Sequence, residues 1–98
     1  MKQFKVKFRR SALNDVREAK AWYEGQQTGL GKKFGERLDA VVERLSHYPE
    51  SGPVVDGPVR KTNLRRFPYT VFYVVEENVI IVIGCRLQAQ DSERWPTL

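Results

Sequence analysis

Residues 60–86, RKTNLRRFPYTVFYVVEENVIIVIGCR, contain two apolar runs at 69–75 and 79–85. Both runs are rich in β-branched and aromatic residues, and neither alternates cleanly between apolar and polar side chains. This pattern predicts two strands that are covered on much of both faces. Residues 76–78, Glu-Glu-Asn, tolerate turns, so a tight hairpin is the simplest connection between the runs. The two strands should therefore form the middle of a sheet.

A basic segment precedes the first apolar run. Pro68 cannot donate a hydrogen bond to a neighbouring strand, so we expect the break between this segment and the run to fall there. Four cations should crowd one strand beside the core, and a fifth should lie at the end of a neighbouring strand. They are Arg60, Lys61, Arg65 and Arg66, followed by Arg86. These side chains could neutralise phosphates or hold an acidic peptide, but a solvated edge strand that its charges keep monomeric fits equally well.

The N-terminal half predicts a strand and two helices. Phe4, Val6 and Phe8 alternate with basic residues, as in an edge or near-edge strand with one face on a core. Ser11 is the expected N-cap of a first helix that carries Asp15 in its first turn and ends near residue 25.

A second amphipathic helix follows a glycine-containing loop. Its apolar residues repeat at helical spacing from Phe34 to Tyr48. Residues 49–58 are rich in proline and glycine, and we expect them to connect this helix to the sheet without regular structure.

The element order predicts an α+β fold. An N-terminal strand and a helical hairpin precede a three-stranded antiparallel meander, and the two helices should pack on one face of a small sheet. The pattern does not decide how the first strand joins the others. With 98 residues, 41% of them hydrophobic, residues 1–98 are expected to form one domain.

Composition bounds the partners and the compartment. The 17 Lys and Arg against 12 Asp and Glu give a net charge of +5, which attracts anions such as nucleic acid or an acidic protein surface. An ordinary surface that happens to be basic is the alternative. Cys85 is the single cysteine, so we expect a reducing compartment and a core role for its side chain. No signal peptide or membrane-spanning segment is recognisable, and we expect a cytoplasmic protein.

The sequence offers little for catalysis. One histidine and one cysteine cannot supply a metal site or a nucleophilic triad, so no metal, cofactor or catalytic residue is expected. His47 lies where the second helix should end, and the expected role is a favourable contact with the helix C-terminus. Trp22 and Tyr23 share a helical register with core positions, which favours core packing or a protein interface over base stacking.

Two motifs together resemble the RelE/ParE toxin superfamily, and specifically its ParE branch. The first is Trp22-Tyr23-Glu24 followed by Gly29-Leu30-Gly31 and Phe34. The second is residues 64–69, LRRFPY, with Phe72-Tyr73. The likeness covers nearly the whole chain, from Phe4 to Trp95. It implies the toxin of a bacterial type II toxin–antitoxin module, with a role in plasmid stabilisation, that a ParD-like, ribbon-helix-helix antitoxin neutralises.

The resemblance also implies a target. ParE proteins poison DNA gyrase, whereas RelE proteins cut messenger RNA on the ribosome. RelE-type nucleases carry an Arg after the strand tyrosine, where this chain has Thr70. They carry another Arg beyond the final strand, where Gln88 is closest, and a Tyr that aligns near Arg94. We therefore expect a gyrase inhibitor that is not an enzyme, with a ribosome-dependent nuclease and a weakly toxic antitoxin-binding module as alternatives.

Candidate binding residues follow from the resemblance. Target binding is assigned to the five cations of the basic segment and to Trp95, and antitoxin binding to residues of the helical hairpin. The hairpin residues are Trp22, Tyr23, Leu30, Phe34 and Leu38. The tail departs from the ParE pattern at Leu87, Gln90 and Ser92, which puts potency and target choice in question.

Overall fold

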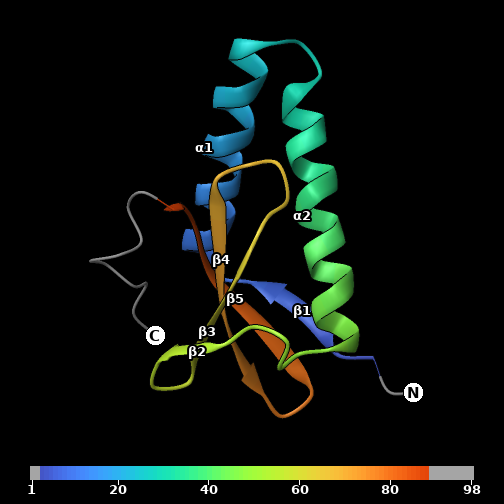
Figure 1. Ribbon diagram of the computed structural model, residues 1–98, viewed down its shortest axis with the longest axis vertical. Coiled ribbons are helices and arrows are strands. Elements are labelled where there is room, and N and C mark those ends of the chain that lie inside the picture. Colours follow the sequence, from blue (N-terminus) through green and yellow to red (C-terminus); the bar gives the residue numbers. More distant parts are fainter. Residues whose placement is uncertain (1–2, 89–98) are drawn as a thin grey trace.

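The structure is a computed structural model that describes residues 3–88 (Figure 1). In this range two helices and a five-stranded sheet form an α+β fold, with sheet order β1-β5-β4-β3-β2. No helix in this range is long and apolar enough to cross a membrane. The elements are β1 (Lys5–Phe8), α1 (Arg10–Gln26), α2 (Leu30–His47), β2 (Val54–Asp56), β3 (Val59–Asn63), β4 (Tyr69–Glu76) and β5 (Val79–Leu87).

The centre of the sheet is the hairpin of β4 and β5, as the two apolar runs predict. Residues 77–78 connect the strands, and Glu77 adopts a positive φ of 52°. With β3 these strands make the expected antiparallel meander. The open question about β1 is resolved by its pairing: it lies parallel to β5 at the edge of the sheet, with Lys5 opposite Val79.

The expectation of an irregular connection over residues 49–58 is wrong, and the sheet has one more strand than predicted. Val54–Asp56 forms β2, which pairs antiparallel with β3. Pro53 and Pro58 flank this short strand, so neither removes a hydrogen bond from its interior. Gly57 supplies the turn with a φ of +52°.

Both faces of the central strands are buried. On one face, the helices pack on β4 and β5 around Phe34, Leu45, Tyr73 and Val82. On the other face Val59, Phe72, Val74 and Ile83 form a second, smaller cluster. Because covered faces leave no room for polar residues, the two runs lack the period-two alternation of a half-exposed strand.

The start of α1 differs from the sequence expectation. The helix begins at Arg10, before Ser11, and its N-cap position is Arg9, which makes no side-chain cap bond. The Ser11 hydroxyl instead donates to the Ile83 carbonyl, 3.4 Å away. Asp15 lies beyond the first turn, and its carboxylate accepts a hydrogen bond from the Cys85 N–H at 3.0 Å. Ser11 and Asp15, which the sequence places at the cap and in the first turn of the helix, therefore bind the backbone of β5 instead.

The tip of the helical hairpin explains the Trp-Tyr-Glu and Gly-Leu-Gly motifs. The two Glu24 carboxylate oxygens accept hydrogen bonds from the Gly29 and Gly31 N–H groups, at 2.9 and 3.0 Å. These N–H groups belong to the start of α2, where a carboxylate is favourable. A Cβ on Gly31 would lie 2.7 Å from the Lys20 carbonyl oxygen, so only glycine lets the helices approach this closely.

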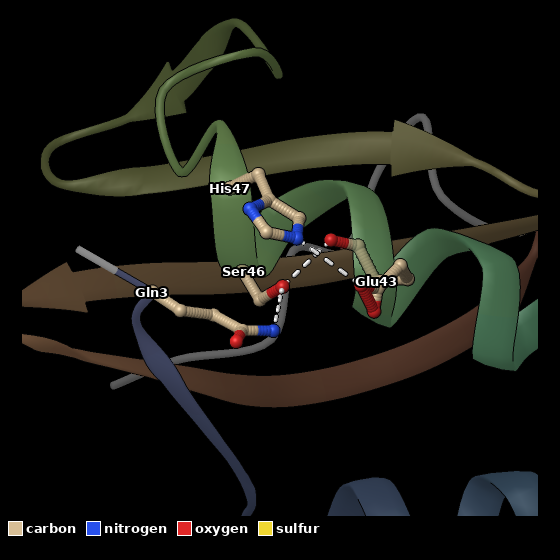
Figure 2. A network of polar contacts seen from close by, with 4 residues as sticks. All are labelled: Gln3, Glu43, Ser46 and His47. Atoms are coloured by element: carbon tan, nitrogen blue, oxygen red, sulfur yellow. Dashed lines mark hydrogen bonds and ion pairs between the residues drawn. The ribbon is translucent and has the colours of Figure 1, made fainter. Parts of the chain in front are cut away.

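The other end of α2 holds the N-terminal segment (Figure 2). The Gln3 amide donates to the Ser46 hydroxyl at 3.1 Å, and that hydroxyl donates to the Glu43 carbonyl at 2.7 Å. His47 lies in the last turn of α2, as predicted, with its Nε2 3.1 Å from a Glu43 carboxylate oxygen. Tyr48 follows the helix and is exposed, although the apolar repeat placed it on the core side.

Candidate functional site

The basic segment is divided between a strand and a loop, so the expectation that four cations share one strand is wrong. Arg60 and Lys61 lie in β3, whereas Arg65 and Arg66 lie in the exposed loop between β3 and β4. The loop leaves the sheet because Leu64 and Phe67 turn into the core. Phe67 packs against the rings of Tyr23 and Phe34, with centroid distances of 4.8 and 5.2 Å.

Arg60 is engaged in holding the fold. Its guanidinium donates to the Gly52 carbonyl at 2.7 Å and to the Glu50 carbonyl at 3.3 Å. Beside it, the buried Tyr73 hydroxyl accepts a hydrogen bond from the Gly52 N–H at 3.0 Å. Together these contacts fasten the loop that enters β2 onto the helix-covered side of the sheet.

Lys61 and Arg86 lie on the opposite face, which the helices do not cover. Residues that face each other across paired strands lie on the same side of a sheet. Lys61 pairs with Phe72 and Arg86 pairs with Thr70, and Phe72 belongs to the second cluster. The two cations therefore flank β4 on one face, which we call the open face because neither helix covers it, although Thr70 and Phe72 on this face are buried. Thr70 lies between them and donates to the Asn63 amide oxygen at 2.8 Å.

A groove separates α1 from the ends of β4 and β5. It has a volume of about 640 Å³. Figure 1 shows the end of β5 running beside the first half of α1. Helix α1 contributes two carboxylates and two aromatic rings, and the strands contribute Tyr69 and three residues at the end of β5. The lining of the groove includes Asp15, Glu18, Trp22, Tyr69, Cys85, Arg86 and Leu87.

The thiol and the phenol groups of this groove stay protonated. Burial raises the pKa of the Cys85 thiol to about 12, and the negative charge of Asp15 adds to the shift. Burial also raises the pKa of Tyr23 and, with help from its neighbours, the pKa of Tyr69. Thiol and phenols are thus protonated at neutral pH, where they can pack and donate hydrogen bonds but do not act as nucleophiles.

The candidate antitoxin-binding residues divide between surface and core. Trp22 is 59% exposed, and Tyr23 and Leu30 are half-buried. Phe34 and Leu38 are buried against the sheet, with 0% and 6% of their surface exposed. In the uncomplexed chain only the first three residues offer surface to a partner, because the helical periodicity of Phe34 and Leu38 is that of the core.

Sequence reasoning missed three elements of these sites and left others outside the described range. Asp15 and Glu18 read as ordinary helix charges, and Gly52 as a loop residue. The one signal in the sequence was the spacing of three residues between the two carboxylates, which puts both on one side of the helix.

Trp95 and the tail positions Gln90, Ser92 and Arg94 lie outside the described residues. Within residues 3–88, no three His, Cys, Asp or Glu side chains cluster as metal ligands would.

Comparisons with known proteins identify a family and a shared fold. A family model described as the ParE toxin of the type II toxin–antitoxin system, parDE, matches residues 6–91. No curated protein sequence matches. The fold resembles three solved structures.

The first is the chromosomal ParDE system from P. aeruginosa, with a TM-score of 0.65 and 17% identity over 89% of this chain and 98% of that one. The second is a mutant of E. coli toxin RelE in the free state, with a TM-score of 0.69 and 24% identity over 93% and 88% of the two chains. The third is the RelBE2 toxin–antitoxin complex from Mycobacterium tuberculosis, with a TM-score of 0.64 and 13% identity over 87% and 98%.

Proposed function

The chain belongs to the ParE toxin family of type II toxin–antitoxin systems, and on this premise we propose that it poisons DNA gyrase by binding, through the open face of its sheet. The family match spans most of the chain and carries the proposal. Lys61 and Arg86, on either side of β4, supply cations that phosphates or carboxylates of the target would pair with.

Such a toxin needs differential affinity and no active site. If it binds the gyrase state that holds cleaved DNA more tightly than the others, mass action increases the population of that state. A rigid sheet suits this role, because side chains on paired strands are held at fixed spacing. Arg65 and Arg66, on the adjacent exposed loop, and Trp95, outside the described range, complete the proposed target-binding set.

The second part of the proposal is a cognate antitoxin, of the ribbon-helix-helix type that the resemblance implies. Two structures with this fold are the ParDE toxin–antitoxin system of P. aeruginosa and the RelBE2 toxin–antitoxin complex of Mycobacterium tuberculosis. Here the exposed Trp22 on α1 is the expected centre of contact, since large aromatic residues dominate the energetics of protein interfaces.

The test compares two targets side by side. Purified protein is added to gyrase with plasmid DNA, and separately to translating ribosomes with a messenger RNA. We expect cleaved plasmid to accumulate with gyrase and no cuts within codons. Lys61→Ala and Arg86→Ala should both reduce DNA cleavage, whereas Lys5→Ala, which removes the same charge from exposed β1, should not.

Each outcome has a meaning. If the messenger RNA were cut within codons, and Lys61→Ala abolished these cuts, the proposal of gyrase poisoning would be wrong and ribosome-dependent RNA cleavage would take its place. Unchanged gyrase and unchanged messenger RNA at micromolar protein would contradict both activities and leave antitoxin binding as the module's main role.

A further inference from the structure

Strand β1 is too short to cover the edge of β5. It pairs with residues 79–82, and the last backbone bond from this side joins the Arg9 N–H to the Val82 carbonyl at 2.9 Å. The chain then turns into α1, while β5 continues to Leu87. Among residues 3–88, about half of the β5 edge therefore has no neighbouring strand.

The side chain of Arg9, which precedes α1, and two side chains of α1 take the place of that strand over the next residues. Arg9 and Ser11 donate to the Ile83 carbonyl at 3.3 and 3.4 Å. Asp15 accepts from the Cys85 N–H at 3.0 Å. These three contacts provide hydrogen bonds for the backbone of β5 up to the Cys85 N–H and not beyond it.

Within the described part of the chain, the edge beyond that point has no hydrogen-bond partner. Backbone groups of successive strand residues point to alternate sides, and the Gln88 N–H points to β4, where it donates to the Pro68 carbonyl at 2.8 Å. The Leu87 N–H and the Cys85 carbonyl consequently point away from β4, over the groove. Among residues 3–88 neither group has a hydrogen-bond partner. One donor and one acceptor are thus available at strand spacing.

The groove walls specify the chemistry of what would bind there. Asp15 and Glu18 make the α1 wall acidic in a chain of net charge +5. Arg86 also lines the groove, but its pairing with Thr70 directs its side chain to the open face, and among residues 3–88 no ion pair joins it to Asp15 or Glu18. Beside Glu18 on the same wall is the exposed ring of Trp22, which attracts cations through its π face.

We propose that this groove binds an extended segment of a partner protein, which adds to the edge of β5 and places a Lys or Arg side chain between Glu18 and Trp22. Main-chain bonds to Leu87 and Cys85 would supply affinity, and the cation would supply specificity. The inference deepens the proposed antitoxin binding, on which it rests only for the identity of the partner. It does not depend on gyrase being the target.

The experiment uses the full chain, labelled with ¹⁵N, and two synthetic hexapeptides of alternating valine and threonine that differ in one central residue, Lys or Glu. We expect millimolar Lys peptide to shift the Cys85 and Leu87 amide resonances and the Trp22 indole resonance, and to slow exchange of the Leu87 N–H. The Glu peptide should bind about tenfold more weakly.

A matched pair of variants tests the acidic wall. Glu18→Lys should weaken the Lys peptide about tenfold, whereas Glu36→Lys, an identical charge change on the exposed surface of α2, should have less than about twofold effect. Equal binding of the two peptides, equal effects of the two variants, or unshifted Cys85 and Leu87 amides would each overturn the proposal. None of these results bears on the gyrase assay, so the two ideas fail separately.

Discussion

The two faces of the sheet hold cations of the same segment for opposite purposes. On the helix-covered face, the Arg60 guanidinium is bound to two loop carbonyls. One residue later, Lys61 lies on the open face opposite Phe72. Positively charged residues that follow one another in a strand are therefore distributed over both faces of the sheet, because successive side chains point in opposite directions. Stability should depend on the first face, and toxicity on the second.

The largest loss of stability should come from a substitution of Gly52, in the loop that Arg60 and Tyr73 hold on the helix-covered side of the sheet. A Cβ at this position would overlap the Lys61 carbonyl oxygen and crowd the Tyr73 hydroxyl. We expect Gly52→Ala to lower the free energy of unfolding by about 3 kcal/mol or more, because backbone must move to relieve the overlap. Urea denaturation measures the loss. Gly25→Ala is the control, since nothing lies within 4 Å of its Cβ, and it should raise stability by about 0.5–1 kcal/mol.

Neighbouring substitutions test the comparison directly. Arg60→Ala should lower the free energy of unfolding by about 1–2 kcal/mol, because two carbonyls lose a charged donor. Among molecules that remain folded, it should preserve gyrase poisoning. Lys61→Ala should reduce DNA cleavage, because the open face loses one of its two cations. Paired denaturation and cleavage assays measure both properties. If Arg60→Ala abolished cleavage at full stability, the division of labour between the faces would be wrong.

Alkaline pH should destabilise the covered face through Cys85. Burial raises the pKa of its thiol from 9.0 to about 12, so between these values the unfolded chain releases a proton that the folded chain keeps. The contribution is complete below pH 9 and is lost as pH rises toward 12, by at most about 1.4 kcal/mol per pH unit. Urea unfolding across this window measures the slope. Cys85→Ala should flatten it, and an unchanged slope would assign the effect to other groups, such as the half-buried Tyr23 and Tyr69.

The smallest effect is expected at the hairpin tip, far from both faces. Glu24→Gln keeps one acceptor oxygen and loses the charge near the start of α2, so stability should fall by about 0.5–1 kcal/mol. Glu18→Gln on the same helix, whose side chain makes no hydrogen bond or ion pair among the described residues, should change stability less. Thermal unfolding of the pair measures the difference. Equal melting temperatures would show that the Glu24 contacts do not stabilise the hairpin.

Local chemistry predicted most of the fold. The two apolar runs, the turn at residues 76–78 and the 3.6-residue repeat of α2 each depend on side chains close in sequence, and all three appear where expected. The parallel pairing of β1 with β5 and the capture of Ser11 and Asp15 by β5 join residues about 70 positions apart. Periodicity carries no information at that range.

By itself, the sequence determined the order and type of the main elements and the family, because hydrophobic periodicity and two motifs are local properties. Only the tertiary structure decided which cation lies on which face, because it places Arg60 on the helix-covered face, where the loop carbonyls at residues 50 and 52 bind it, and Lys61 on the other face. It also decided where β5 is left with an open edge. The open edge arises because β1 ends at Phe8 and is shorter than β5. These two strands are far apart in the sequence, so no local pattern predicts the difference in their lengths.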